Sequence, residues 1–338
     1  MAESYSSEQK PDWQPSATLD ALHLRATLLA RLRGYFAGQG VLEVETPLLA
    51  SAGVTDPHIP SFTLADSGMS SGQGGDARRY LNTSPEFAMK RLLAAGAGPI
   101  YQVCKAFRRG EQGRHHNPEF TLLEWYRPGF DDHRLMQDVA ALLAVLAEGV
   151  RELGSVEYRS YHDCFQQQLG LDPHTATAQA LRDCARQHDL PVVCGLADDD
   201  RDGWLDLLMS HSIQPQLGRG HPCFVYDYPE SQAALARVRP GNPAVAERFE
   251  LFIDGIELAN GFHELQDADE QRARFEADLA QRRADGLEMV VIDERLLAAL
   301  DAGLPDCAGV ALGLDRLQMV LTGETHLRDV LAFDYARS

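Results

Sequence analysis

The sequence lacks the segments that would place it in a membrane or outside the cell. Residues 1–17 are polar and contain no apolar core of the kind that a signal peptide has. The longest apolar run at helical spacing, Ala140 to Ala147, is far shorter than the ~18–20 residues that cross a bilayer. We therefore expect a soluble, cytoplasmic protein with a disordered tail at residues 1–17 and no membrane contact.

Paired cysteines are also missing. The six cysteines are irregularly spaced, and no two of them form a CxxC pair. This spacing argues against both a disulfide framework and a zinc site. The doublet His115-His116 has no further ligand at metal-binding spacing, so we expect no metal ion there.

Positive charge is scarce in this chain. There are 31 Lys and Arg against 50 Asp and Glu, the formal net charge is −19, and no basic run occurs. Proteins that grip nucleic acid neutralise phosphates with clustered Lys and Arg, so this composition disfavours stable binding of nucleic acid. A cationic small substrate would instead be attracted. With 338 residues and 44% hydrophobic composition, the chain can bury a large core.

Periodicity predicts a mixed α/β chain, because apolar residues recur at both helical and strand spacing. The expected helices cover residues 18–38, 131–148, 175–188, 267–284 and 315–322, with another at the end of 80–93. The expected strands cover residues 41–46, 100–107, 119–126, 223–228, 249–261 (with a turn) and 308–314. Residues 67–76 are rich in Gly and Ser and predict a mobile loop. Residues 150–240 are harder to assign and include a possible insertion.

One candidate site is a hairpin over residues 107–126. A strand, a polar turn and a returning strand would place Arg108, Glu111 and Asn117 at one mouth of a sheet. The planar guanidinium of Arg108 can bind a phosphate. On the returning strand Glu124 and Tyr126 share one face, and an acid beside a phenol can hold an ammonium group. Taken alone, the segment also fits a hairpin with surface charges.

Two later segments carry further candidates. Glu257 and Glu264 flank an expected turn at Asn260-Gly261, where carboxylates can hold Mg²⁺ between nucleotide phosphates or meet a substrate amine. Residues 309–316 alternate small with apolar residues, so one strand face is bare enough for a flat ring, and Arg316 can reach a phosphate. Taken singly, these segments also fit a solvated turn and a packed core strand.

These segments occur in an order that is typical of one family. The first expected helix with residues 40–47, the 107–126 hairpin and GVALGLDR at 309–316 resemble motifs one, two and three of class II aminoacyl-tRNA synthetases. LNTSPEFAMK at 81–90, HNPEF at 116–120 and GIELANGFHEL at 255–265 resemble lysyl-tRNA synthetases in particular. From about residue 18 onward, the chain is most similar to the stand-alone paralogues of those enzymes that ligate (R)-β-lysine to elongation factor P.

The resemblance implies a fold, a reaction and a partner. It implies an α+β, class II synthetase catalytic domain over residues 18–338, with a mostly antiparallel sheet flanked by helices, and a homodimer formed through the first helix. It implies that ATP and Mg²⁺ are used to activate (R)-β-lysine as an adenylate, and that elongation factor P accepts the product on a lysine. Lysyl-tRNA synthetases carry an anticodon-binding domain before motif one. Motif one begins near residue 18 here, so we expect a protein acceptor and not tRNA.

The resemblance also implies roles for individual residues. The catalytic pair is Arg108 and Arg316. The ATP-binding set is Arg108, Arg109, Gly110, Glu111, Asn117, Glu257, Leu258, Gly313 and Arg316. The substrate-binding set is Ser84, Pro85, Glu86, Tyr126, Glu264 and Ala311, and the metal-binding pair is Glu257 and Glu264.

Two positions depart from the lysyl-tRNA synthetase pattern. Motif two of those enzymes usually reads Phe-Arg-Asn-Glu, whereas Glu111 here is displaced by one residue, which leaves the roles of residues 109–111 open. Those enzymes usually have Gly where this chain has Ala311. A methyl group there would crowd an α-amino group and leave space for a β-amino group.

Other functions remain open from sequence alone. One is a truncated lysyl-tRNA synthetase-like enzyme that activates α-lysine for tRNA or another small acceptor. Another is an amide-forming synthetase for small molecules on the same fold. A non-catalytic regulatory paralogue is disfavoured because Arg108, Glu257, Glu264 and Arg316 are all retained.

Overall fold

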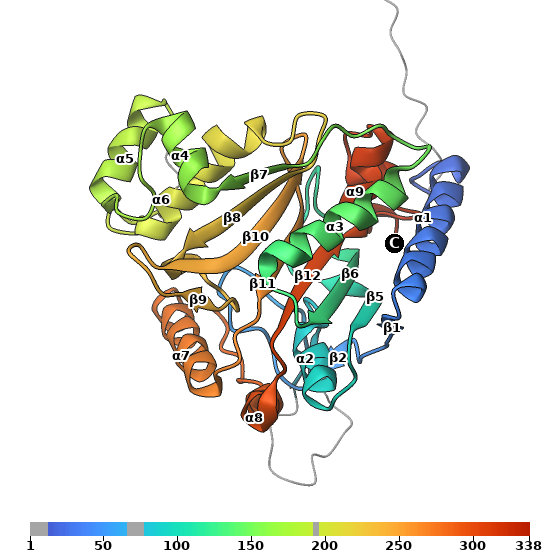
Figure 1. Cartoon of the computed structure of the whole chain (residues 1–338), viewed down its shortest axis with the longest axis horizontal. Coiled ribbons are helices and arrows are strands. Elements are labelled where there is room, and N and C mark those ends of the chain that lie inside the picture. Colours follow the sequence, from blue (N-terminus) through green and yellow to red (C-terminus); the bar gives the residue numbers. More distant parts are fainter. Residues whose placement is uncertain (1–12, 66–77, 192–195) are drawn as a thin grey trace, which may run out of the picture.

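A large mixed sheet forms the centre of the molecule (Figure 1). The structure, a computed structural model, describes residues 13–65, 78–191 and 196–338. The strand order is β1-β5-β6-β12-β11-β10-β8-β7, and β9 pairs with β10. The strands are β1 Leu42–Glu43, β5 Ile100–Phe107, β6 Glu119–Pro128, β7 Glu157–Ser160, β8 Cys223–Pro229, β9 Val238–Arg239, β10 Val245–Ile253, β11 Ile256–His263 and β12 Cys307–Gly313. The β1–β5 and β7–β8 pairs are parallel, and the other pairs are antiparallel.

A second, three-stranded sheet lies apart from the large one and has the order β2-β4-β3. Its strands are β2 Leu49–Ala50, β3 Thr63–Ala65 and β4 Arg78–Leu81. Helices flank the large sheet: α1 Leu19–Gly38, α2 Glu86–Ala94, α3 Asp132–Ala147, α4 Tyr161–Leu169, α5 Ala178–Gln187, α6 Arg201–Leu208, α7 Ala268–Ala284, α8 Glu294–Gly303 and α9 Leu314–Thr322. The predicted α+β architecture with a mostly antiparallel sheet is confirmed.

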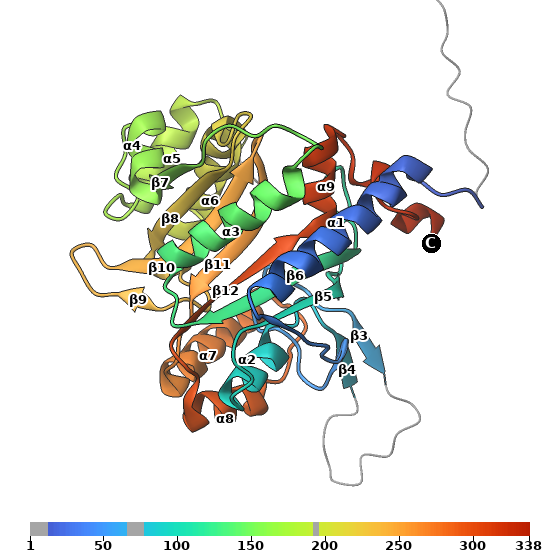
Figure 2. The same ribbon diagram turned by 45° about the vertical axis from the view of Figure 1, so that its right-hand side comes forward.

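Helices α1 and α3 cover one face of the sheet (Figure 2). In α1, Leu28, Leu32 and Phe36 recur at four-residue spacing, so they form one buried stripe. Phe36 stacks on Tyr101 of β5 with ring centroids 4.3 Å apart. Thr18 caps the start of α1, because its side chain accepts a hydrogen bond from the Ala21 amide. The helix that the sequence predicts at residues 18–38 is therefore confirmed.

Much of the segment that was hard to assign belongs to the large sheet. Strands β7 and β8 form one edge of it. Helices α4, α5 and α6 lie at that edge (Figure 1) and share a second hydrophobic cluster around Phe165, Trp204 and Leu208. The segment thus extends the large sheet and adds a helical layer to it.

Three expectations differ from the structure. The Asn260-Gly261 turn is wrong, because β11 runs through it and the turn lies at Asp254-Gly255, where both φ angles are positive. The disordered tail is wrong for Ser16 and Ala17, whose amides bond to carbonyls near the C-terminus. The predicted strand at 41–46 reduces to the two residues of β1. The tail up to residue 12 and the predicted 67–76 loop lie outside the described residues.

Among the described helices, none is long and apolar enough to cross a membrane.

Candidate active site

A cavity of about 790 Å³ lies on the sheet face opposite to α3. The strand alternation explains this placement. In β12, Val310 and Leu312 pack into the core beneath α3, while Ala311 and Gly313 line the cavity. Side chains of its wall come from the 107–126 hairpin, from residues 255–265 and from residues 309–316. Residues far apart in the chain thus meet in one place.

Arg108 lies where β5 ends and its side chain lines the cavity. Its guanidinium lies 5.1 Å from the centroid of the Phe120 ring, and its Nη1 is 3.5 Å from Glu111 Oε1. Stacking on an aromatic ring holds the planar group while leaving donors free for an anion. The guanidinium is therefore held at the wall of the cavity, where it can meet an anion.

Arg316 lies in the first turn of α9 and ties three segments together. Its Nε donates to the His115 carbonyl (3.1 Å), and its Nη1 donates to the Glu257 carbonyl (3.0 Å). Its Nη2 is 2.8 Å from His116 Nε2. Burial and the nearby Arg316 charge lower the pKa of His116, which favours a neutral ring that accepts this hydrogen bond. The hairpin, β11 and α9 are thus fixed around one guanidinium.

Two carboxylates, Glu250 and Glu257, also line the cavity, from β10 and β11. The partly buried Arg248 donates from Nη2 to Glu250 Oε1 at 2.5 Å. Burial, together with the negative charge of Glu257, raises the pKa of Glu250 to about 7. Two neighbouring carboxylates in a partly buried wall are a setting that favours a bound cation.

The deepest polar group is built around Lys90 of α2. This side chain is only 1% exposed, and its Nζ lies 2.6 Å from Glu86 Oε1 and 2.7 Å from Glu264 Oε2. The two carboxylates raise the pKa of Lys90 against the opposing effect of burial, so it stays charged. Burial raises the pKa of Glu264 to about 7.

Glu124 of β6 is a third buried carboxylate beside this pair. Its two oxygens accept hydrogen bonds from Ser84 Oγ (2.6 Å) and from Tyr126 Oη (2.7 Å). The predicted common face of Glu124 and Tyr126 is confirmed by that second bond. Burial and the charge of Glu86 raise the pKa of Glu124 to about 8. Glu86, Glu124 and Glu264 are called the acid cluster below. Among the described residues, Lys90 is the one lysine that pairs with this cluster, through Glu86 and Glu264.

Gly309 makes room for the acid cluster. A Cβ atom at this position would lie 2.5 Å from Glu264 Oε1 and closer still to the ring of Tyr126. Both side chains can lie against the β12 backbone because Gly309 has no side chain. The small residues that the sequence shows on this strand thus serve the polar cluster as well as the cavity.

Most of the predicted site residues line the cavity. They are Ser84, Pro85, Glu86, Arg108, Glu111, Asn117, Glu257, Leu258, Ala311, Gly313 and Arg316. Tyr126 and Glu264 lie buried behind the wall, joined to it through Glu124 and Lys90.

Two residues of the predicted ATP-binding set lie off the wall. Arg109 points toward Glu288, 3.6 Å away, and Gly110 occupies the turn with a φ of +85°. Asn117 is on the wall, but its amide donates to the Glu119 carbonyl and accepts from the Tyr335 amide. Asn117 thus fixes the hairpin to the C-terminal segment.

Glu257 and Glu264 cannot share a metal ion. They lie at opposite ends of β11, and seven residues of extended strand span about 23 Å. The predicted joint metal site is therefore wrong in its geometry. Its physical cause is the missing turn at Asn260-Gly261.

Several residues of the site were not predicted from the sequence. They are Lys90, Arg248, Glu250 and Asp315. Asp315 is buried at the start of α9, where it forms an ion pair with Arg25 of α1 and accepts from the Thr121 amide. The i,i+4 spacing of Glu86 and Lys90 was the available signal for the lysine. Nothing local signals that Arg248 and Glu250 share a face of β10 with the cavity.

Comparison of the sequence with known proteins identifies the family of this chain. The sequence matches the family model for tRNA synthetases class II (D, K and N) over residues 9–337. Similar curated relatives come from Salmonella dublin, Klebsiella pneumoniae subsp. pneumoniae and Salmonella paratyphi B. Each is named elongation factor P–(R)-β-lysine ligase, is 49% identical over 326 residues, and covers 96% of this chain and 98% of the relative. This chain therefore belongs to the class II tRNA synthetase family.

Proposed function

We propose that this chain activates (R)-β-lysine with ATP and transfers the β-lysyl group to a lysine side chain of elongation factor P. The names of the relatives support this reaction. The observation that carries it is the acid cluster with its single bonded lysine, set beside two arginines of the cavity wall. A substrate with two ammonium groups and one carboxylate matches that arrangement of charge.

In the first step, a carboxylate oxygen of β-lysine attacks the α-phosphorus of ATP. The bond to the pyrophosphate oxygen breaks, and the products are the β-lysyl adenylate and pyrophosphate. Arg108 and Arg316 offset the negative charge on the phosphates from two sides of the cavity. Catalysis of this kind rests on positioning and on preorganised charge.

The substrate amines are held by the acid cluster. Glu86 lines the cavity and offers its carboxylate directly. Glu124 and Glu264 lie behind it, with their pKa values raised because burial disfavours the ionised form. A bound ammonium group favours the ionised carboxylates, since opposite charges stabilise each other in a buried site. Ser84 and Tyr126 hold Glu124 in place.

The residues of the cavity fit Mg²⁺ at Glu250 and Glu257. Both are oxygen donors on the wall, and burial together with the charge of Glu257 raises the pKa of Glu250. Mg²⁺, when bound with ATP, neutralises phosphate charge. Arg248 orients Glu250 through its hydrogen bond. We assign the metal to this pair, and Glu264 to the substrate.

In the second step, the neutral amine of the acceptor lysine attacks the carbonyl carbon of the adenylate. The bond to the AMP oxygen breaks, an amide forms and the amine loses a proton. The acidic charge of the chain favours a protein acceptor over nucleic acid. We further propose a homodimer that involves α1 and the segment after it, where Leu19, Leu42 and Leu49 are exposed. We place the reaction in the cytoplasm.

An ATP–pyrophosphate exchange assay tests the activation step. Exchange should depend on β-lysine, and Glu86→Gln should raise the KM for β-lysine more than the KM for ATP. Glu288→Gln is the matched control, because Glu288 pairs with Arg109 off the cavity wall. Exchange that needs no β-lysine, or equal effects of the two substitutions, would contradict the proposal.

A further inference from the structure

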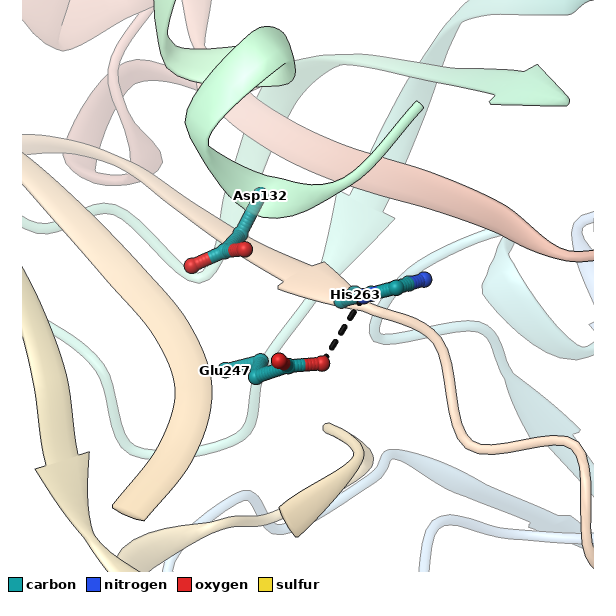
Figure 3. Close-up of side chains that lie close together, drawn as sticks. All are labelled: Asp132, Glu247 and His263. Atoms are coloured by element: carbon teal, nitrogen blue, oxygen red, sulfur yellow. Dashed lines mark ion pairs between the residues drawn. The ribbon is translucent and has the colours of Figure 1, made fainter. Parts of the chain in front are cut away.

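A cluster of three side chains lies on the face of the sheet that α3 covers, away from the cavity. Asp132 is the first residue of α3, Glu247 belongs to β10 and His263 ends β11 (Figure 3). One ligand atom of each residue lies within 4.8 Å of the others. None of the three lines the cavity, so the proposed reaction does not use them.

The facing atoms of this cluster have no hydrogen-bond partner. Asp132 is 2% exposed and His263 is 7% exposed. His263 Nδ1 lies 2.8 Å from Glu247 Oε2, yet neither atom forms a hydrogen bond of acceptable geometry, and Asp132 Oδ2 has no partner at all. Leaving buried polar atoms unsatisfied is costly, which indicates that a group absent from the polypeptide completes them.

The second nitrogen of His263 is held by another carboxylate. His263 Nε2 lies 2.9 Å from Asp306 Oδ1, and Asp306 in turn binds Arg237 Nη2 at 2.6 Å. An Nε2–H that donates to Asp306 leaves the lone pair of Nδ1 directed at Glu247 and Asp132. A carboxylate that orients a histidine in this way is the usual outer partner of a histidine bound to a metal.

The surrounding charges leave the cluster negative. Arg239 forms an ion pair with Glu247 at 3.5 Å, but it divides its charge with Asp227, which lies closer at 2.7 Å. Asp132 is buried beside the carboxylate of Glu247, and a cation bound between the three residues would offset the repulsion between the two acids.

We propose that Asp132, Glu247 and His263 bind one divalent transition-metal ion of the Zn²⁺ type, separately from the active site. An imidazole nitrogen with two carboxylates suits Zn²⁺ and its first-row neighbours, whereas Mg²⁺ and Ca²⁺ prefer oxygen ligands alone. The ion would join α3 to β10 and β11, the strands that carry Glu250 and Glu257. It is a stabilising site, because it lies across the sheet from the reacting groups.

Metal binding to untagged, chelator-treated protein tests this site. Zn²⁺ is titrated by calorimetry, and Co²⁺ by its visible absorption, with excess Mg²⁺ present to fill sites made of oxygen ligands. The wild type should bind one ion per chain. Asp132→Asn and His263→Gln should weaken binding by at least about 10-fold, the loss that is typical even of an outer partner. His221→Gln is the matched control, because His221 pairs with Glu157 at 3.0 Å without a third acid, and it should bind as the wild type does.

Thermal unfolding separates loss of the site from loss of the fold. Zn²⁺ should raise the Tm of the wild type and of His221→Gln, but not that of Asp132→Asn. Without metal, Asp132→Asn should be at least as stable as the wild type, since it removes a buried charge whose Oδ2 has no hydrogen-bond partner. No ion bound by the wild type, or unchanged affinity in Asp132→Asn, would overturn the proposal. ATP, β-lysine and the acceptor are absent from both measurements, so the result does not depend on the proposed function.

Discussion

Gly309 offers the sharpest test of how the acid cluster is built. A Cβ atom there would lie 2.5 Å from Glu264 Oε1 and nearer to the ring of Tyr126, whereas favourable contacts between heavy atoms need about 3.5–4.0 Å. Tyr126 has little room to retreat, because it is 2% exposed and its hydroxyl is bonded to Glu124. Gly309→Ala must therefore displace the two side chains by about 1 Å.

The cost of that displacement follows from general experience with crowded cores. Overpacking destabilises by about 1–3 kcal/mol, and a displacement of about 1 Å in a substrate-positioning group can lower catalysis by about 100-fold. We expect Gly309→Ala to lose about 1–3 kcal/mol of unfolding free energy. The kcat/KM for β-lysine should fall by about 100-fold, while the KM for ATP stays near its wild-type value.

Urea unfolding and ATP–pyrophosphate exchange measure these two effects. Gly313→Ala is the control for stability, because its Cβ would meet no atom closer than 3.9 Å. It should be neutral or gain up to about 1 kcal/mol, since alanine restricts the unfolded chain. A Gly309→Ala variant with wild-type stability and wild-type kinetics for β-lysine would refute the packing argument.

Four further outcomes are expected. Burial raises the pKa values of Glu124 and Glu264 to about 8 and about 7, so the folded protein binds more protons than the unfolded chain does. The unfolding free energy of the substrate-free protein should therefore fall as the pH rises from about 4.5 to about 8, and Glu124→Gln should flatten this slope in urea unfolding; an unchanged slope would contradict the raised values. Lys90→Met should cost about 3–5 kcal/mol in the same assay, because it leaves buried carboxylates unpaired; an unaltered unfolding midpoint would count against the ion pairs. Arg316→Lys should lower the rate of exchange, since a lysine cannot replace three directed hydrogen bonds, and full activity would exclude that role. Ala311→Gly should raise activation of α-lysine relative to β-lysine in exchange assays, and an unchanged ratio would remove Ala311 as the discriminating residue.

Local patterns were sufficient to predict much of the fold. The mostly apolar run at residues 100–107 predicts a strand with the observed limits of β5, and the apolar spacing over residues 18–38 predicts α1. These signals are local, because a helix or strand that buries one face repeats its apolar residues with a fixed period. The resemblance of the motifs to class II synthetases then predicted the mostly antiparallel sheet and most of the residues that line the cavity.

What could not be predicted depends on contacts between distant segments. The Asn260-Gly261 pair is a strong turn signal, but Gly261 serves here to let the Phe249 ring of the neighbouring strand lie against the backbone of β11. Lys90 is visible in sequence as a partner of Glu86, but its bond to Glu264 requires α2 to lie beside the end of β11. The approach of Asp132 to His263 likewise arises only when α3 packs on the sheet.

The central claim is tested most directly by the mass of the acceptor. Purified elongation factor P is incubated with this protein, ATP and Mg²⁺, together with (R)-β-lysine, α-lysine or neither, and is then analysed by intact-protein mass spectrometry. We predict a gain of one β-lysyl group with (R)-β-lysine, a smaller fraction modified with α-lysine, and no gain when ATP is omitted or Arg108→Ala replaces the wild type. An unmodified acceptor with both amino acids would contradict the proposed function.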